Sequence, residues 1–164
     1  MTTASLILLL VTLQRLSELI IARRNTAALM AGGAIEHGAA HYPVMVLLHA
    51  SWLAGLWWFG WNAVVNWPLM YLYFALQFFR IWILATLGSR WSTRILTVPN
   101  EQLVVRGPYR FVRHPNYLLV LLEVPLLPFA LGLNGFALLY GLLNIAMLMW
   151  RIRVEEAALT PARQ

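Results

Sequence analysis

The sequence predicts an all-α integral membrane protein of about five transmembrane helices, with a C-terminal helical hairpin and a polar cytoplasmic loop. Two observations predict this fold class. Of the 164 residues, 61% are hydrophobic and only 11% are charged, whereas a soluble domain carries about 25% charged residues. Several apolar windows also reach the length of about 20 residues that a helix needs to cross a bilayer. We therefore expect one transmembrane domain that covers residues 1–164.

Five apolar windows are expected to form the membrane helices. Their expected ranges are residues 4–22, 43–62, 68–87, 116–131 and 135–152. The last two are joined by a short turn around Gly132 and Asn134, which predicts an antiparallel hairpin. Pro125 and Pro128 interrupt the first arm of this hairpin, and we expect them to kink it or to keep it shallow in the membrane. The N-terminal run has no positive region before it and is expected to remain as a helix.

The basic residues are distributed unevenly between the two sides of the expected bundle. All of them are arginines. Apart from Arg15 and Arg80 they follow the first and third expected helices or lie from the end of the fifth onward, whereas residues 63–67 and 132–135 are uncharged. The positive-inside rule places such Arg-rich segments in the cytoplasm. We therefore expect the N-terminus outside and the C-terminus, including Arg163, in the cytoplasm. Four tryptophans near the first uncharged turn suit the membrane interface: Trp57, Trp58, Trp61 and Trp67.

Polar and ionisable residues recur within the expected helices. They are Gln14, Arg15, Glu18, His49, Gln77, Arg80, Glu123 and Asn144. Such residues are costly in lipid and usually line a site or pair with one another. All lie roughly one to two turns from the expected cytoplasmic ends, which predicts one polar cavity open to that side. Two structural alternatives remain: Arg15 and Glu18 would neutralise each other on one helix face, and Arg80 would pair with Glu123 between helices.

The longest polar stretch, residues 88–115, is the expected cytoplasmic loop. Its segments RILTVP and LVVRG predict two short extended arms joined by a turn at Asn100 and Glu101.

The segment RGPYRFVRHPNY closes this loop and enters the fourth expected helix. Gly107 and Pro108 predict a turn, Pro115 disfavours helical geometry at His114, and Asn116 is expected to cap the helix. These features predict a rigid elbow at the membrane surface. Its arginines would also suit an anchor to lipid headgroups, which is an alternative without catalysis.

The same segment resembles the signature of the isoprenylcysteine carboxyl methyltransferase family, in which G-x-Y-x-x-x-R-H-P-x-Y precedes a helical hairpin. In that family an Arg and a Glu-Glu pair follow the hairpin, and Arg151, Glu155 and Glu156 match them. An intramembrane Arg followed by an apolar run and a Gly matches residues 80–88. Three blocks in the same order argue against chance agreement. The N-terminal half is similar to small bacterial members that methylate alkylpyrones and phenolic lipids, which implies a bacterial cytoplasmic membrane.

This resemblance implies an S-adenosylmethionine-dependent O-methyltransferase acting at the cytoplasmic face on a lipophilic or prenylated substrate. The acceptor is left open between a carboxylate and an acidic hydroxyl, and membrane lipids are the expected surroundings. Arg80 would hold the acceptor oxygen, and His49 or Glu123 would take a proton from a protonated acceptor. For His49, a hydrogen bond between helices is the structural alternative. The residues implied to contact or shape the cofactor site are Gly107, Pro108, Tyr109, Arg113, His114, Pro115, Tyr117, Arg151, Glu155 and Glu156.

One departure from the family concerns the C-terminus. The family continues beyond the Glu-Glu pair with an aromatic, Gly-containing tail, whereas this chain ends in ALTPARQ. Closure over the cofactor is therefore expected to be incomplete or to need another subunit, and the sequence does not specify an oligomeric state.

Other functions are excluded or less well supported. The absence of Cys and Asp excludes thiolate chemistry and a Ser-His-Asp triad. The arginines border apolar runs instead of forming a solvated face, so we expect no nucleic-acid partner. Glu36, His37 and His41 lie close together in the sequence, but they do not make up a firm set of three metal ligands. We therefore expect no metal site. Two alternatives remain: an NADPH-dependent membrane reductase of related architecture, and a lipid-binding scaffold without activity.

Overall fold

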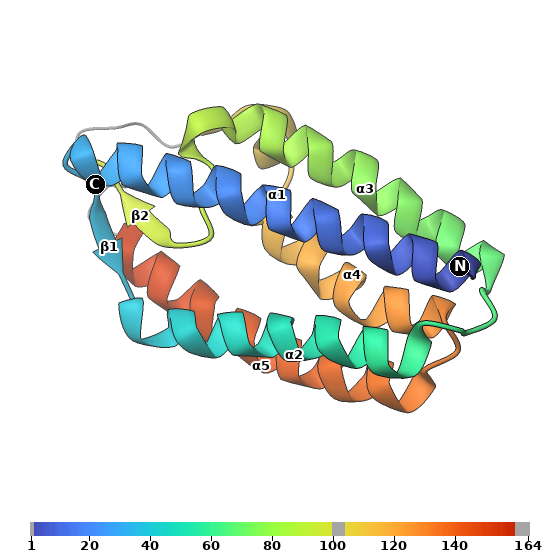
Figure 1. Cartoon of the computed structure of the whole chain (residues 1–164). Helices are drawn as coiled ribbons and strands as arrows, with labels where there is room; N and C mark the ends of the chain where they lie inside the picture. The colour runs from blue at the N-terminus through green and yellow to red at the C-terminus, as the bar shows by residue number, and fades with distance from the viewer. Residues whose placement is uncertain (1, 100–103, 160–164) are drawn as a thin grey trace.

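The computed structural model describes residues 2–99 and 104–159, and in this part the helices run back and forth between two ends of one bundle (Figure 1). Helices α1 (Thr3–Ala31), α3 (Trp67–Leu87) and α5 (Asn134–Leu159) run in one direction, and α2 (Tyr42–Gly60) and α4 (Pro115–Ala130) run back. α4 packs against both α3 and α5. Strands β1 (Ile35–His37) and β2 (Ile95–Thr97) mark the sheet end of the bundle, and residues 61–66 and 131–133 form the opposite turn end.

Four helical segments of the described chain are long and apolar enough to cross a membrane. They are Thr3–Ala31, Ala39–Gly60, Trp67–Arg90 and Asn134–Ala158. α4 has 16 residues, which is about 24 Å at a rise of 1.5 Å per residue and less than the hydrocarbon thickness of about 30 Å. Four of the five helices that the sequence predicted to span the membrane thus meet the length criterion, and α4 is a shorter apolar helix inside the same bundle.

Two helices continue further at the sheet end than the sequence predicted. α1 ends at Ala31 and α5 at Leu159, where residues 22 and 152 were expected. Residues 23–31 and 153–159 contain no Gly or Pro, so nothing interrupts the backbone hydrogen bonds. The predictions stopped where hydrophobicity fell, but a helix satisfies its own backbone in water as well as in lipid. Both extensions carry side chains into the sheet end.

The fold is mostly helical, but the loop contributes one strand of a small sheet that the all-α prediction did not include. β2 pairs antiparallel with β1, with Leu96 opposite Glu36. The first extended arm predicted in the loop, RILTVP, thus contains β2, and its partner is β1. The turn predicted at Asn100 and Glu101 lies outside the described residues.

Side-chain contacts hold β1 on the loop. Arg94 Nη1 donates to both oxygens of Glu36, at 2.6 and 2.8 Å, and the Arg94 guanidinium lies 4.4 Å from the centre of the Tyr42 ring. His37 Nε2 lies 2.8 Å from Thr97 Oγ1. The segment between α1 and α2 is thus fixed to residues 94–97, which are far away in the sequence.

Side chains of two neighbouring helices donate to backbone oxygens of α4, one of which is freed by a proline. Pro128 has no N–H to donate to Val124 O, and Trp52 Nε1 of α2 donates to that oxygen at 3.0 Å. Asn144 Nδ2 of α5 donates to Val120 O at 3.1 Å. Side chains of α2 and α5 therefore bind the α4 backbone in the segment where the sequence predicted a kink or a shallow insertion.

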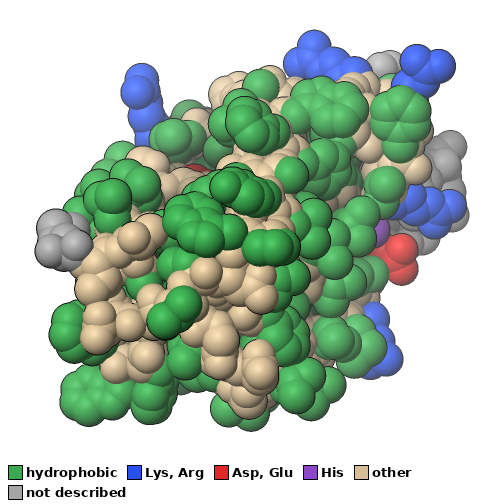
Figure 2. Space-filling model, turned by 90° about the vertical axis from the view of Figure 1, so that its right-hand side faces the viewer, with side chains coloured by type: hydrophobic (Ala, Val, Ile, Leu, Met, Phe, Trp, Pro, Cys, Tyr) green, Lys and Arg blue, Asp and Glu red, His purple; other side chains and the backbone are tan. Residues whose placement is uncertain are grey.

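The turn end of the bundle is apolar. Figure 2 looks at this end, where hydrophobic side chains and backbone fill the centre and arginines project only at the margin. Trp58, Trp61 and Trp67 are exposed there, as a membrane-interface role requires. Trp57 points inward instead, because its Nε1 donates to Thr12 Oγ1 of α1 at 2.9 Å.

Candidate active site

The elbow before α4 depends on a glycine and a proline. Gly107 has a φ of 58°, and a Cβ atom there would lie 2.4 Å from Thr86 Oγ1 of α3. Only glycine fits both the backbone conformation and the close approach. Pro115 is the first residue of α4, where its missing N–H costs nothing. The residue before it, His114, occupies the cap position, so the prediction that Asn116 caps this helix is wrong.

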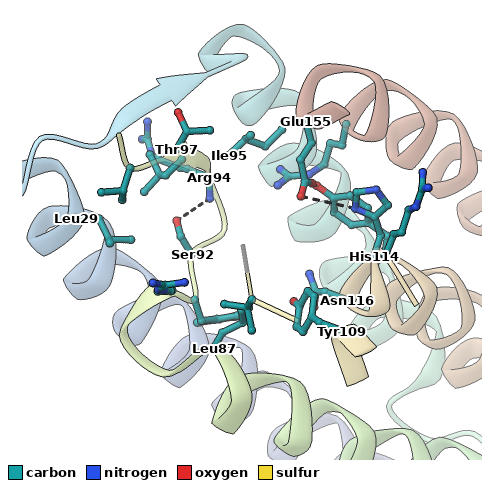
Figure 3. A pocket seen from close by; sticks show the side chains of 18 of the residues that line it. Leu29, Leu87, Ser92, Arg94, Ile95, Thr97, Tyr109, His114, Asn116 and Glu155 are labelled. Carbon is teal, nitrogen blue, oxygen red and sulfur yellow. Dashed lines mark hydrogen bonds and ion pairs between the residues drawn. The ribbon is translucent and has the colours of Figure 1, made fainter. Parts of the chain in front are cut away.

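A cavity of about 350 Å³, here called the loop cavity, opens between the elbow, β2 and the end of α5 (Figure 3). The residues of the predicted cofactor site that line it are Tyr109, Arg113, His114, Tyr117, Arg151 and Glu155. The other four predicted residues do not line it. Gly107, Pro108 and Pro115 shape the elbow backbone, and Glu156 Oε1 lies 3.8 Å from His114 Nε2.

The opposite wall of the loop cavity comes from residues that the sequence analysis did not single out. Figure 3 shows Leu29, Arg94 and Thr97 across the cavity from His114 and Glu155. Leu29 reaches the cavity because α1 runs past the expected end, and the absence of a helix breaker before Gly32 was the signal that would have found it. The predicted incomplete closure concerns the tail ALTPARQ, residues 158–164, of which residues 160–164 lie outside the described residues.

Glu155 is the carboxylate of the loop cavity. Tyr117 Oη donates to it, and His114 Nδ1 lies 3.6 Å from its Oε1, with the His114 ring stacked on Tyr117. Hydrogen bonding and attraction from Glu155 raise the pKa of His114 above its ordinary 6.5, against the effect of burial. Burial raises the pKa of Tyr109, so its hydroxyl stays protonated. Within the described residues, the buried Trp91 Nε1 has no hydrogen-bond partner.

A second cavity of about 320 Å³, the bundle cavity, lies between the helices. Its walls come from all five helices and from loop residues 91–93, and they are mainly apolar, with Leu16, Leu53 and Met147 among them. It shares part of its wall with the loop cavity. The shared residues are Trp91, Ser92, Asn116, Tyr117 and Arg151. The two cavities are therefore neighbours. The loop cavity, at the sheet end, is the more polar of the two, and the bundle cavity, inside the bundle, is the more apolar.

A charge-balanced network of two arginines and two glutamates lies at the bundle cavity. Arg80 donates through Nε, at 3.1 Å, and through Nη2 to Glu123, and through Nη1 to Glu18 at 2.9 Å. Glu123 also accepts from Arg15 Nη2 at 3.0 Å and from Gln77 Nε2 at 2.8 Å. Arg15 Nη1 lies 3.2 Å from Glu18. Both structural pairings that the sequence left open are therefore present at once.

The three predicted catalytic residues differ in their access to the cavities. Arg80 and His49 line the bundle cavity, whereas Glu123 lines neither cavity and is 0% exposed. His49 Nδ1 lies 2.9 Å from Met45 O, one turn earlier on α2. The structural alternative for His49 was a hydrogen bond between helices. The bond observed lies within α2. Since a carbonyl oxygen only accepts, Nδ1 carries the proton and Nε2 keeps a lone pair.

The three residues considered as metal ligands have other partners. Glu36 binds Arg94, His37 contacts Thr97, and His41 is buried against Trp150. Across residues 2–99 and 104–159, no group of three or more His, Cys, Asp or Glu side chains is placed to hold a metal ion.

Comparison with known proteins gives one family and two relatives. Residues 69–161, from α3 to the end of α5, match the model of the family described as "Isoprenylcysteine carboxyl methyltransferase (ICMT) family". The uncharacterized protein YpbQ of Bacillus subtilis is 34% identical over 94% of this chain and 95% of its own length. An uncharacterized protein of Haemophilus influenzae is 27% identical over 89% of this chain and 88% of its own length. No solved structure matches the chain.

Proposed function

Because the chain belongs to the isoprenylcysteine carboxyl methyltransferase family, we propose that it is an integral membrane O-methyltransferase that uses S-adenosylmethionine. Membership of this family, predicted from the RHPNY segment and its neighbouring blocks, is confirmed. With four helices long and apolar enough to span a bilayer, the protein is a multi-pass membrane protein. The proposal adds the methyl donor and the acceptor, a carboxylate or acidic hydroxyl on a lipophilic molecule.

The observation that carries the proposal is the wall shared by the loop cavity and the bundle cavity. In the proposed methyl transfer, a water-soluble donor and a lipophilic acceptor must bring their reacting atoms into contact. The bundle cavity suits a hydrocarbon tail, because apolar side chains form most of its surface. A donor in the loop cavity and an acceptor in the bundle cavity would meet at Tyr117 and Arg151.

The loop cavity offers groups that suit S-adenosylmethionine. When bound, this cofactor supplies an electrophilic methyl group on a positively charged sulfur. The guanidinium of Arg113 suits its carboxylate, and Glu155 suits its ammonium group. Trp91 Nε1, a buried donor without a partner in the described chain, is available to an oxygen of the cofactor. The Tyr117 ring is electron-rich and favours a nearby cation.

His49 is the proposed proton acceptor when the methyl acceptor is a hydroxyl. Its Nε2 keeps a lone pair, and the residue lines the bundle cavity. Glu123 suits this role less well, because its oxygens already accept four hydrogen bonds from Arg15, Gln77 and Arg80. A carboxylate acceptor brings no proton and needs no base.

An NADPH-dependent reductase of related architecture is the second candidate. One observation favours it: Arg90, Arg94 and Arg113 all line the loop cavity, and guanidinium groups suit the phosphates of NADPH. These arginines would also bind anionic lipid headgroups in a scaffold protein. Membership of a methyltransferase family favours the first proposal over both.

The test of the proposed function combines transfer and binding. Purified protein in detergent, given S-adenosylmethionine labelled in the methyl group and total lipid from cells lacking the gene, should label a lipid that becomes heavier by one CH₂ unit. S-adenosylhomocysteine should raise the thermal midpoint, because a ligand that binds only the folded state stabilises it, and NADPH should not. Stabilisation by NADPH alone would favour the reductase, and no effect of either ligand would favour the scaffold.

The sheet end, with the elbow and its arginines, is proposed to face the cytoplasm. The positive-inside rule supports this orientation, because the turn end carries no charged residue in residues 61–66 and 131–133. We expect a phosphatase reporter that is active only outside the cytoplasm to be silent when fused after Gln164, a position beyond the described residues. The same reporter inserted after Gly132 should be active. The opposite pattern would reverse the orientation.

A further inference from the structure

We propose that Arg15, rather than Arg80, is the guanidinium that holds the acceptor oxygen during methyl transfer. This inference rests on the proposed function and assigns a residue to the acceptor side of the site. Arg15 lies on α1, outside residues 69–161 that match the family, so family membership alone does not point to it. Both arginines line the bundle cavity, and the question is which of them is available to a ligand.

The hydrogen-bonding groups of Arg80 are engaged within the protein. Its Nε, Nη1 and Nη2 all donate to Glu123 or Glu18, and its side chain is only 4% exposed. A ligand could reach this guanidinium only by displacing a buried carboxylate, which would leave that carboxylate with Arg15 as its remaining cationic partner among the described residues. Arg80 therefore holds the two glutamates in place.

Arg15 is available by the same criteria. Its side chain is 24% exposed, and it makes one hydrogen bond from Nη1 to Glu18 and one from Nη2 to Glu123. Of the five N–H groups of a guanidinium, Arg15 uses two and Arg80 uses three. The greater exposure of Arg15 makes its remaining donors accessible to a ligand in the bundle cavity.

The network does not depend on Arg15 to satisfy its carboxylates. Without Arg15, Glu18 would keep its bonds from Arg80 Nη1 and from Gln14 Nε2, at 2.9 Å each. Glu123 would keep two bonds from Arg80 and one from Gln77. If Arg15 turns toward an acceptor, both carboxylates therefore still accept hydrogen bonds from Arg80 and from a glutamine.

A separate observation indicates that the bundle cavity takes a polar headgroup as well as a tail. Asn144 lines this cavity and is 0% exposed, and its Oδ1 has no hydrogen-bond partner in the described chain. A buried amide oxygen without a partner is costly. An acceptor headgroup with an acidic oxygen for Arg15 and a hydrogen-bond donor for Asn144 would satisfy both side chains.

In the transfer step the acceptor oxygen forms a bond to the methyl carbon, the carbon–sulfur bond breaks, and its electron pair stays on sulfur. The negative charge on oxygen and the positive charge on sulfur disappear together. A hydroxyl acceptor gives its proton to His49 Nε2, and a carboxylate has none to give. Arg15 contributes by keeping the oxygen anionic and positioned in a site that excludes water.

The test compares Arg15→Gln with Arg80→Gln in detergent, using total lipid from cells lacking the gene as the acceptor source. For Arg15→Gln we expect kcat/KM for label transfer into lipid to fall by roughly 10- to 100-fold, the loss that follows removal of one hydrogen bond to a charged group. The stabilisation by S-adenosylhomocysteine should remain, and the thermal midpoint without ligand should fall less than in Arg80→Gln, because both carboxylates keep Arg80 and a glutamine as donors. Arg80→Gln should lower that midpoint strongly, because both carboxylates lose their main donor.

Two results would overturn the assignment to Arg15. One is wild-type kcat/KM in Arg15→Gln, and the other is loss of the S-adenosylhomocysteine effect together with transfer, which would place Arg15 in folding or in the cofactor site. A wild-type protein that transfers no label refutes the proposed function itself, and the inference with it. Failure of the inference alone is therefore distinguishable, because the wild type then transfers label normally.

Discussion

Replacing Glu123 with Leu should lower the free energy of unfolding by about 3–5 kcal/mol, the cost of leaving a buried charge without its partner. Glu123 is 0% exposed and accepts hydrogen bonds from Arg15, Arg80 and Gln77. Its removal leaves two guanidinium groups facing one carboxylate, that of Glu18. The thermal midpoint in detergent measures the effect, and failure to accumulate in the membrane would be its extreme form.

A matched control is available in Glu36→Gln. Glu36 also forms an ion pair with an arginine, at 2.6 Å, but the two side chains are 19% and 36% exposed. Exposed ion pairs contribute only about 0–1 kcal/mol, so this variant should stay near the wild-type midpoint. Equal stability of Glu36→Gln and Glu123→Leu would contradict the account of the buried network.

The double variant Arg80→Leu with Glu123→Leu tests what the pair does. It removes one charge of each sign and leaves Arg15 facing Glu18, so it should recover much of the stability that Glu123→Leu loses. Transfer activity in this double variant would be incompatible with the predicted contact between Arg80 and the acceptor oxygen. It would agree with Arg15 in that role.

The sequence was informative about which residues are polar inside the bundle and less informative about which way they face. In α1 both the lipid-facing and the core-facing sides are apolar, so hydrophobic periodicity does not orient Arg15 relative to Glu18. The pairings Arg15–Glu18 and Arg80–Glu123 were each foreseen as alternatives. In the structure they form one network, in which Arg15 is partly exposed and Arg80 is buried. This arrangement depends on the rotation of each helix about its axis, which packing determines.

The sheet end was the least predictable part of the fold. β1 and β2 have three residues each, too few to show a period of two, and they pair across a separation of about 60 residues in the sequence. The elbow was better predicted, because Gly107 and Pro115 have local conformational requirements that do not depend on distant contacts. Accordingly, the cavity residues nearest the elbow were found from sequence, and those contributed by α1 and β2 were not.

Replacing Glu155 with Gln should abolish the stabilisation by S-adenosylhomocysteine, because Glu155 is the carboxylate in the loop cavity that suits the ammonium group of the ligand. Gln keeps the shape and a hydrogen-bonding oxygen for Tyr117, so the variant should remain folded. Arg153→Gln, an exposed position on the same helix that does not line the cavity, is the control and should keep the full effect. An undiminished effect in Glu155→Gln would remove this residue from the cofactor site.

The pH dependence of stability provides a second, independent measurement of the same contact. Glu155 raises the pKa of His114 above 6.5, so the protonated imidazole is favoured in the folded protein. A raised pKa adds stability that is fully present below 6.5 and is lost as the pH rises through the folded-state value. The difference in midpoint between the wild type and His114→Gln should therefore be largest near pH 6 and shrink toward about pH 9. In a Glu155→Gln background the same comparison should show a weaker slope, because only Glu156 of the two carboxylates that raise this pKa remains. An undiminished slope there would assign the raised pKa to a group other than Glu155.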